Sequence, residues 1–505
     1  MQRGMNWGRM LERQAKKRRN KLALVFGDLK FTYGELNSLA NQLANYLRKT
    51  GVGKNDRVAI YLPNCWEHIV SHFGALKIGA VIVPFNVMYK AREIKYMLDD
   101  SEAEIIITNS DLYRHVKEVK DASKLRNIIL TDPENTLEHS FSDIFGEPHV
   151  LQEDVILDET EDLALIQYTS GTTGEPKGAM LTYHNIFSNV RVTANLYDFD
   201  ETDTQLITLP LFHSFGIFAV YYSIYTGGTI VLVGRFDPEI VLELIDKFQV
   251  SIFCNVPPML LSLLTVSNPE RFDLRSLRHC LCGAAVLPVE VLERVKKFLG
   301  VNVVDGYGCT ESFGMIVPPQ VGVYRYGSIG VPLPVQEIRL VDEEGQDVPV
   351  GEVGEIVSRG PLLMKGYWRK PEETAEAIRN GWFHTGDLAK KDEEGFYYIV
   401  GRKKDMIISS GFNIYPKEIE ELLYQHPKIA DATVIGIPHE YKGETVKACI
   451  VLKEGMEATQ EEIIHYCRDK LAVFKAPTVV EFREDLPRNP SGKVLKRVLR
   501  EEHQG

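Results

Sequence analysis

A short segment rich in glycine and hydroxyl side chains has the residue types that suit phosphate binding. It reads Tyr168-Thr-Ser-Gly-Thr-Thr-Gly-Glu-Pro-Lys-Gly-Ala-Met180 and directly follows the apolar run Leu163-Ala-Leu-Ile-Gln167. Glycines at 171, 174 and 178 let the main chain approach phosphate oxygens, to which backbone N–H groups and hydroxyls donate. The spacing matches neither a Walker A loop nor a dinucleotide fingerprint. A surface turn is the alternative interpretation, but a lysine and three glycines directly behind a strand favour a phosphate loop.

The elements that must hold this loop alternate between apolar runs and amphipathic segments. Thr32 and Glu35 have the spacing of a capping box, which predicts a helix that ends near Gly51. Short apolar runs then recur at 58–62, 80–83, 104–108 and 127–130 before the loop, and at 205–209, 229–233, 251–254, 279–282 and 302–304 after it. This alternation predicts two successive α/β units, each with a parallel sheet covered by helices.

The pattern changes in the last third of the chain. Between about 325 and 400, alternating apolar residues are interrupted by Gly, Asp and Pro, which predicts an antiparallel, barrel-like part. The following residues predict a small α+β domain with a helix from Pro416, a strand over Thr433–Ile435 and a capping box of Thr459 and Glu462. We therefore predict an α/β fold with a large N-terminal domain, 1–401, and a small mobile C-terminal domain, 402–505.

Composition excludes several classes of protein. The 505 residues are 44% hydrophobic and 25% charged, and no apolar stretch approaches the roughly 20 residues that cross a bilayer. A net charge of −12 argues against a general nucleic-acid binder. The basic run 16–19 is interpreted as a solvated helix face rather than a membrane-surface patch. Seven cysteines without a Cys-x-x-Cys pair indicate reduced, mostly buried thiols, and the N-terminus has no signal-peptide pattern, so we expect a cytoplasmic protein.

The loop at 169–178 resembles the signature loop of the adenylate-forming enzymes: acyl-CoA synthetases, coumarate-CoA ligases, luciferases and the adenylation domains of peptide synthetases. Five further stretches resemble the other motifs of this family, in the family's order, from about residue 20 to the end. They are Leu209–Gly216, Gly283–Ala285, Asp305–Glu311, Trp382–Asp387 with Arg402, and Pro487–Lys493.

The resemblance implies a role for each matching residue. The implied catalytic residues are Lys493, Glu311 and His213. The implied ATP- and AMP-binding residues are Thr169, Ser170, Gly171, Thr172, Thr173, Gly174, Lys177, Gly283, Ala284, Ala285, Asp305, Gly306, Tyr307, Gly308, Thr310, Asp387, Ile399 and Arg402. The acyl pocket would include Phe212, Phe215, Gly216, Gly314 and Met315, and the CoA and hinge residues would be Lys404, Ser410 and Gly411.

The residue types agree with these roles. Glu311, together with Thr169, would hold Mg²⁺ against the ATP phosphates, because oxygen donors are what this ion prefers. The Asp387 carboxylate can accept hydrogen bonds from both ribose hydroxyls, and Arg402 stays protonated at any working pH. A carboxylic acid would attack the α-phosphate to give acyl-AMP and pyrophosphate, and the CoA thiol would then displace AMP. The expected partners are therefore the acid, ATP and CoA, with at most peripheral membrane contact and a homodimer left open.

Several alternatives concern the acid and its acceptor. The apolar pocket residues favour a medium- or long-chain fatty acid, with an aryl acid of the coumarate or benzoate type next. Free CoA is favoured over a carrier protein because the chain ends at Gly505, shortly after Lys493, and Ile407–Ile419 resembles the acyl-CoA synthetase version of its motif. A nucleotide sensor without turnover and a luciferase-like oxidation are the remaining alternatives. The sequence Gly283-Ala-Ala-Val286 and Cys309 depart from the commoner family pattern and put the acid's identity in doubt.

Overall fold

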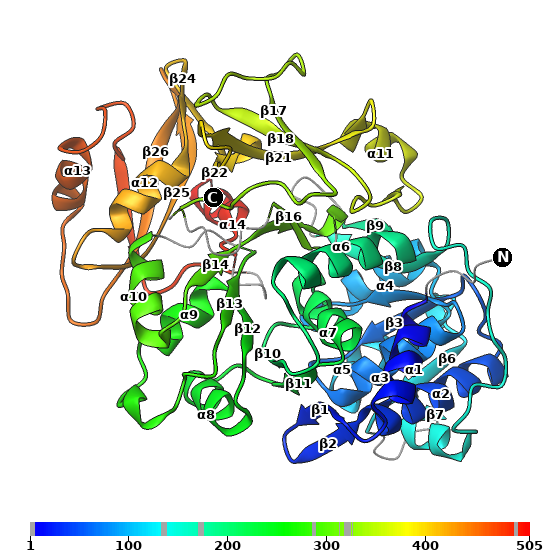
Figure 1. Cartoon of the computed structure of the whole chain (residues 1–505). Helices are drawn as coiled ribbons and strands as arrows, with labels where there is room; N and C mark the ends of the chain where they lie inside the picture. The colour runs from blue at the N-terminus through cyan, green and yellow to red at the C-terminus, as the bar shows by residue number, and fades with distance from the viewer. Residues whose placement is uncertain are drawn as a thin grey trace.

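The computed structural model describes residues 6–132, 139–169, 176–284, 289–312, 314–317, 325, 327–488 and 493–504, with the backbone alone at 314–317 and 504. Figure 1 shows four parts that follow one another along the chain. The blue-to-cyan and green parts are two α/β units, the yellow part is rich in strands, and the orange-to-red part is the C-terminal α+β unit.

The first sheet has the strand order β19-β9-β8-β4-β3-β5-β6-β7 within the described residues. Its strands are β3 (Arg57–Tyr61), β4 (Val81–Pro84), β5 (Ile105–Thr108), β6 (Asn127–Leu130), β7 (His139–Ser140), β8 (Leu163–Thr169), β9 (Lys177–Thr182) and β19 (Gly366–Tyr367). The strands from β8 to β7 are parallel, as predicted, whereas β8 and β9 form an antiparallel hairpin to which β19 adds. The predicted phosphate loop therefore connects the two strands of a hairpin.

The second sheet, in the order β14-β13-β12-β10-β11-β1-β2, includes two N-terminal strands that the apolar runs did not predict. Its strands are β1 (Leu22–Phe26), β2 (Leu29–Thr32), β10 (Thr204–Ile207), β11 (Thr229–Leu232), β12 (Ile252–Asn255), β13 (His279–Cys282) and β14 (Val303–Asp305). The N-terminal strand β1 pairs in parallel with β11, with Leu24 opposite Ile230. The two α/β units are thus not strictly successive, because the apolar strand β1 is buried against the second sheet.

The strand-rich part is antiparallel, as predicted. Its sheet has the order β17-β18-β21-β20, with β22 paired to β21, and a separate two-stranded ribbon joins β15 to β16. These strands are β15 (Tyr307–Cys309), β16 (Gly314–Val317), β17 (Glu337–Val341), β18 (Gly354–Arg359), β20 (Ile378–Arg379), β21 (Trp382–Lys391) and β22 (Tyr397–Arg402).

The C-terminal unit has a sheet of its own, β24-β23-β26-β25, with β27 on β26. Its strands are β23 (Ile407–Ser409), β24 (Phe412–Ile414), β25 (Ile429–His439), β26 (Gly443–Leu452) and β27 (Val479–Arg483). The predicted strand over 433–435 is thus the centre of the longer β25. The helix α12 begins at Pro416, as expected.

Helices cover the sheets on both faces in the two α/β units. The helices are α1 (Trp7–Lys17), α2 (Tyr33–Lys49), α3 (Trp66–Lys77), α4 (Ala91–Ser101), α5 (Ser110–Lys117), α6 (Tyr183–Leu196), α7 (Ser214–Thr226), α8 (Pro238–Phe248), α9 (Pro257–Leu263), α10 (Val289–Leu299), α11 (Pro371–Ala377), α12 (Pro416–Tyr424), α13 (Gln460–Arg468) and α14 (Lys496–Gln504). Short 3₁₀ turns are η1 (Lys120–Ala122), η2 (Phe141–Gly146), η3 (Pro269–Arg271), η4 (Thr310–Ser312) and η5 (Lys403–Asp405).

The local helix signals in the sequence have mixed outcomes. Both reciprocal bonds of the Thr32–Glu35 capping box are present at the start of α2. At α13 the Thr459 hydroxyl accepts from the Glu462 N–H at 3.1 Å, but the Glu462 carboxylate accepts from the Lys428 ammonium at 2.9 Å. The predicted second capping box is therefore half formed, because a lysine outside the helix binds its carboxylate.

The predictions from charge and cysteine content are confirmed in part, because the Arg18 side chain of the basic run 16–19 is only 11% exposed and bonds to Gln14 and Glu201. Lys16 and Lys17, at the end of α1, are exposed, and Lys16 pairs with Glu12 one turn earlier. All seven cysteines are free, five of them buried. No helix in the described part of the chain combines the length and the hydropathy of a membrane span.

Candidate active site

Tyr307, Asp387 and Arg402 form one bonded cluster. The register of β21 and β22 places Asp387 opposite Arg402, and the Arg402 Nε donates to Asp387 Oδ1 at 2.8 Å. The Tyr307 hydroxyl donates to the other carboxylate oxygen at 2.7 Å. Burial and then the Asp387 charge hold the pKa of Tyr307 well above its usual value, so the phenol remains a donor. Each carboxylate oxygen keeps a second lone pair, which is what two ribose hydroxyls would require.

Lys493 lies close enough to this cluster for their charges to act on one another. Burial, with the Arg402 charge next, lowers the pKa of Lys493 to about 8. The pKa of His213 is lowered to about 4, by burial and then by the Lys493 charge. The Lys493 ammonium therefore acts on both the Tyr307–Asp387–Arg402 cluster and His213, which belongs to the segment predicted to line the acyl pocket. His213 is neutral at working pH, whereas Lys493 is mostly charged.

The segment that carries Lys493 is fixed to the C-terminal unit on both sides. Before it, Arg488 forms an ion pair with Asp431 on β25. After it, the Lys496 ammonium lies 2.8 Å from a Glu420 carboxylate oxygen. The Leu495 N–H also donates to the Pro487 carbonyl at 2.7 Å, which closes the loop. These contacts anchor the residues on both sides of Lys493 to the C-terminal unit.

The described ends of the predicted phosphate loop lie on the β8–β9 hairpin. Thr169 is opposite Lys177 in the register, and its hydroxyl donates to the Lys177 carbonyl at 3.4 Å. Side chains of helix α4 bond to both flanks of the loop. The Tyr168 hydroxyl donates to Asp100 at 2.5 Å, and the Tyr96 hydroxyl donates to the Pro176 carbonyl at 2.9 Å. Five residues predicted to bind phosphate lie outside the described residues: Ser170, Gly171, Thr172, Thr173 and Gly174.

Glu311 lies in the turn η4, which Thr310 begins. Its Oε1 accepts from the Tyr367 hydroxyl at 2.9 Å, and its carbonyl accepts from the Met364 N–H at 2.6 Å. The part of the chain that the structure describes holds no group of three or more acidic, histidine or cysteine ligands that could bind a metal alone. A single oriented carboxylate nevertheless fits Mg²⁺, which typically binds one or two protein carboxylates together with substrate phosphates and water.

The predicted acyl loop, 209–213, is held by buried amides. The Asn64 Nδ2 donates to the Leu209 carbonyl at 2.9 Å and to the Val233 carbonyl at 3.0 Å, while its Oδ1 accepts from the Leu211 N–H at 2.8 Å. The Gln167 amide donates to the Phe212 carbonyl at 2.8 Å. These bonds fix the backbone next to His213, whose Nδ1 accepts from the N–H of the second residue of α7 at 3.4 Å.

Three glycines near this loop differ in what surrounds them. A Cβ on Gly216 would lie 2.1 Å from the Pro210 carbonyl oxygen, so its small size is required by the packing of α7 against the loop. A Cβ on Gly283 would contact the Gly306 carbonyl oxygen at 3.3 Å and the Phe215 ring at 3.4 Å. Gly308 pairs with Met315 in the β15–β16 ribbon. The motifs around Phe215, Gly283 and Gly306 therefore meet in space, as the resemblance implied.

Four other predicted residues lie in three places: at the ends of β13 and β14, before α7, and in the β15–β16 ribbon. Asp305 is the last residue of β14, and Ala284, after β13, is exposed with a φ of 67°. Phe212 is buried, and Gly314 pairs with Cys309 in the ribbon. Ala285 lies outside the described residues, and so do the side chains of 314–317.

The residues still to be placed are Ile399, predicted to bind AMP, and the predicted hinge and CoA residues. Of these, Lys404 lies near the cluster, since burial and then the Arg402 charge lower its pKa. Ile399 is on β22, and its carbonyl accepts from the Lys417 ammonium at 2.8 Å. Lys404 lies in η5 and is exposed. Ser410 and Gly411 form the tip of the β23–β24 hairpin with φ values of 52° and 82°, and a Cβ on Gly411 would meet nothing within 4 Å. In this arrangement Lys493 acts on the Tyr307–Asp387–Arg402 cluster, while the Gly411 tip is open.

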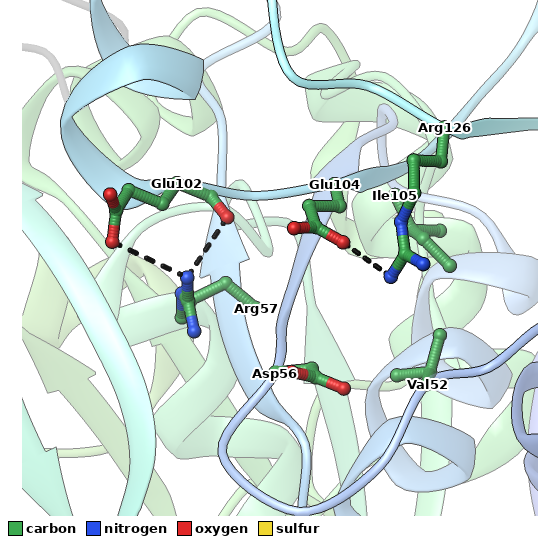
Figure 2. Close-up of a pocket in the computed structure, with 7 residues that line it drawn as sticks. All are labelled: Val52, Asp56, Arg57, Glu102, Glu104, Ile105 and Arg126. Atoms are coloured by element: carbon green, nitrogen blue, oxygen red, sulfur yellow. Dashed lines mark hydrogen bonds and ion pairs between the residues drawn. The ribbon is translucent and has the colours of Figure 1, made fainter.

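A small pocket elsewhere in the first unit has no such arrangement. Figure 2 shows its lining residues, Val52, Asp56, Arg57, Glu102, Glu104, Ile105 and Arg126. Arg57 and Ile105 begin β3 and β5, whereas Thr169 ends β8, which is parallel to them through β4. The pocket is therefore at the opposite edge of the sheet. Its charges pair with one another, Arg57 with Glu102 at 3.6 Å and Arg126 with Glu104.

Sequence reasoning missed Asn64 and Tyr367, which bond the proposed site residues. Asn64 follows Pro63, a dipeptide that marks a turn, and Tyr367 lies in Gly366-Tyr-Trp368, where an aromatic pair follows a glycine. Neither pattern indicates what the side chain contacts. Their partners are 145 and 56 residues away, respectively.

The site and fold are those of enzymes that bind adenine nucleotides and activate carboxylic acids. The model of the AMP-binding enzyme family matches residues 11–368, and that of the AMP-binding enzyme C-terminal domain matches residues 418–493. The chain belongs to this family.

Relatives of this chain include CoA ligases for different acids. The long-chain-fatty-acid–CoA ligase of Bacillus subtilis strain 168 is 39% identical, with 96% of this chain and 92% of that protein covered. The feruloyl-CoA synthase of an Amycolatopsis species is 37% identical, with 97% of each chain covered. The anthranilate-CoA ligase AuaEII superimposes with a TM-score of 0.94 at 30% identity, covering 99% of this chain and 98% of that one. The protein is an acid–thiol ligase that forms acyl-CoA using ATP.

A pair of structures of one protein bears on the arrangement of the whole chain. ATP-bound MatB from Rhodopseudomonas palustris superimposes with a TM-score of 0.92, whereas apo MatB from the same organism superimposes with 0.79. Both are 32% identical and cover 99% of each chain. The present arrangement is therefore closer to that of ATP-bound MatB.

Proposed function

We propose that the acid is a medium- or long-chain fatty acid and that the structure is arranged for the first half-reaction, the formation of acyl-AMP. The observation that carries this proposal is the position of Lys493, whose charge acts on both Arg402 and His213. Acyl-AMP formation brings a carboxylate and the α-phosphate together, so an ammonium between a nucleotide cluster and an acyl loop is placed to offset their charge. The likeness to ATP-bound MatB supports the same assignment.

The residues would divide the work as follows. Asp387 would bind the ribose through its remaining lone pairs, and Arg402 would keep that carboxylate oriented. Lys177 and the loop before it would bind the outer phosphates. Lys493 would donate to an α-phosphate oxygen while the acid attacks and pyrophosphate leaves.

Glu311 and the Thr169 hydroxyl are the residues that we assign to Mg²⁺. When bound, the ion would neutralise charge on the phosphates and on the leaving pyrophosphate. Glu311 suits this role because its carboxylate is already oriented by the Tyr367 hydroxyl, and oriented ligands bind metals more tightly.

The second half-reaction requires another arrangement. The CoA thiol would attack the acyl carbon past the β23–β24 tip, where Ser410 and Gly411 now face open space. Lys493 and this tip belong to the same unit, so both cannot occupy the site together. The unit from about residue 402 would therefore rotate near Lys404, an exposed residue in a single turn of 3₁₀ helix. In the present arrangement His213 is neutral, since burial and then the Lys493 charge lower its pKa to about 4.

The assignment of a fatty acid rests on the acyl loop and on one relative. Phe212, Phe215 and Ile217 are buried and apolar, which suits an alkyl chain, and the Bacillus subtilis relative is a long-chain-fatty-acid–CoA ligase. An aryl acid is the second candidate, because feruloyl-CoA synthase is nearly as similar. We also propose a cytoplasmic location, with which the free thiols agree.

A panel of acids from acetate to palmitate, with benzoate, coumarate and ferulate, tests this assignment. Each acid is assayed for exchange of labelled pyrophosphate into ATP and then for acyl-CoA formation. We expect the highest kcat/KM in both assays with a fatty acid of about eight or more carbons. A higher kcat/KM for the aryl acids would replace the fatty acid by the aryl alternative. Exchange without CoA thioester formation would contradict CoA as the acceptor.

A further inference from the structure

Tyr367 lies between two parts of the proposed site that are far apart in sequence. It is the second residue of β19 and is opposite Ala179 on β9. Its side chain is 8% exposed, and it is packed into the main hydrophobic core. A tyrosine so buried keeps one geometry, because its neighbours leave no alternative rotamer.

The phenol contacts a charged residue of each part. Its hydroxyl donates to Glu311 Oε1 at 2.9 Å, and its ring lies under the Lys177 ammonium, with Nζ 5.2 Å from the ring centroid. Burial, followed by the Glu311 charge, raises the pKa of Tyr367, so the hydroxyl keeps its proton and remains a donor. The ring face attracts the cation while the hydroxyl binds the anion.

The backbone around Tyr367 joins the same two parts. The Met364 N–H donates to the Glu311 carbonyl at 2.6 Å, and the Trp368 N–H donates to the Gly178 carbonyl at 2.7 Å. The segment 364–368 thus joins the end of the phosphate loop to the turn that carries Glu311. The backbone bonds of Met364 and Trp368 therefore fix the position of the Tyr367 side chain independently of Glu311 and Lys177.

A carboxylate and an ammonium at one phosphate-binding site attract each other, and a direct ion pair would withdraw both from the substrate. We propose that Tyr367 is a positioning residue that gives Glu311 and Lys177 separate partners, so that the carboxylate stays oriented towards the metal and the ammonium towards the outer phosphates. This inference rests on the proposed roles of Glu311 and Lys177.

The substitution Tyr367→Phe tests the inference, because it removes the hydroxyl and keeps the ring. ATP binding is measured by calorimetry with Mg²⁺ and with EDTA. We expect the factor by which Mg²⁺ strengthens ATP binding to fall about tenfold in the variant, the value of one hydrogen bond to a charged group. ATP binding in EDTA should change less than about twofold, and attack of CoA on supplied acyl-AMP should match the wild type.

Tyr398→Phe is the matched control, since the Tyr398 hydroxyl also donates to a carboxylate, Asp392, at 2.9 Å. It should leave the Mg²⁺ effect unchanged. An unchanged Mg²⁺ effect in Tyr367→Phe would overturn the inference. So would equal losses in ATP binding with and without Mg²⁺ together with a lower melting temperature, since these indicate a structural role only.

Glu311→Gln, measured in parallel, separates this inference from the proposed function. If Glu311→Gln retains pyrophosphate exchange and the wild-type Mg²⁺ effect, the assignment of Glu311 to the metal is wrong, and the positioning role is overturned with it. If Glu311→Gln loses both but Tyr367→Phe behaves as wild type, the metal assignment stands and only the role of Tyr367 is overturned.

Discussion

The proposed nucleotide side and the proposed acyl side of the site are held by different kinds of bond. On the nucleotide side, charged and phenolic side chains bond to one another, as Arg402 and Tyr307 do to Asp387. On the acyl side, the amides of Asn64 and Gln167 bond to the backbone of loop 209–213. The side chains of the acyl loop are thus free to vary without loss of the bonds that place it. This difference fits a family in which similar structures act on different acids.

The largest expected effect tests whether acyl-AMP formation depends on the charge of Lys493, which the proposed rotation would move away from the site. Lys493→Ala should lower the rate of acyl-AMP formation by about 10²- to 10³-fold, the range for removal of one group that stabilises transition-state charge. Conversion of supplied acyl-AMP to acyl-CoA should persist. Lys404→Pro should show the reverse, because proline restricts the φ change that rotation needs. Separate assays of the two half-reactions measure both variants.

Arg497→Ala is the control for Lys493→Ala, since Arg497 is an exposed cation four residues further on that pairs with Glu501 of its own helix. It should leave both half-reactions unchanged. Parallel losses of both half-reactions in Lys493→Ala and in Lys404→Pro would contradict the two arrangements proposed for the C-terminal unit.

A smaller effect concerns pH. The pKa of Lys493 is lowered to about 8, so its ammonium is present below that pH and is lost above it. We expect kcat/KM for ATP in acyl-AMP formation to be near its maximum at pH 7, to be half of it at about pH 8 and to fall about tenfold per pH unit at higher pH, because this ratio reports groups of the free enzyme. Lys493→Arg stays charged, so its residual activity should not show this fall. An unchanged alkaline limb in Lys493→Arg would assign the titration to another group.

The smallest effect tests the acyl side. Asn64→Leu removes three hydrogen bonds to the backbone of the acyl loop and its neighbours, which should cost about 2–4 kcal/mol in the free energy of unfolding. It should also raise KM for the acid several-fold with little change in KM for ATP. Denaturant unfolding and steady-state kinetics measure these quantities.

Asn45 offers a matched control within the chain. Its amide donates to the carbonyls of Pro148 and Val150, both at 2.9 Å, and accepts from the Gln152 N–H at 3.2 Å. Asn45→Leu should cost similar stability and leave KM for the acid unchanged. If the two variants raise KM for the acid equally, Asn64 acts on overall stability and not on the loop.

Local patterns predicted most of the fold. The parallel strands, the start of α12 and the capping box of α2 each follow from residues within a few positions of one another. The second capping box is half formed because Lys428, 34 residues away, binds its carboxylate. The spacing of residues in one segment does not show which side chains of other elements bond to it. For this reason the second capping box was predicted in full but is half formed.

The resemblance named candidate site residues, whose roles stay predictions, but not their contacts. The resemblance identified Asp387, Arg402 and Tyr307, and the structure joins these three side chains by two short bonds. It gave no signal for Tyr367 or Asn64, because their function lies in distant partners. Gly216 was predicted as part of the acyl pocket, whereas the Pro210 carbonyl leaves no room for a side chain there. A small residue can reflect packing as readily as a cavity.

The pairing of β1 with β11 has a consequence for biosynthesis. Leu24 emerges from the ribosome about 200 residues before its partner Ile230. At about 5–20 residues per second, this apolar strand waits about 10 to 40 s for its place in the sheet. During that time β1 can pair with β2, but its other edge has no partner strand until β11 is synthesised, and chaperones bind exposed apolar segments of this kind. The second unit, although it is continuous in sequence after residue 200, is completed by the first part of the chain to be synthesised.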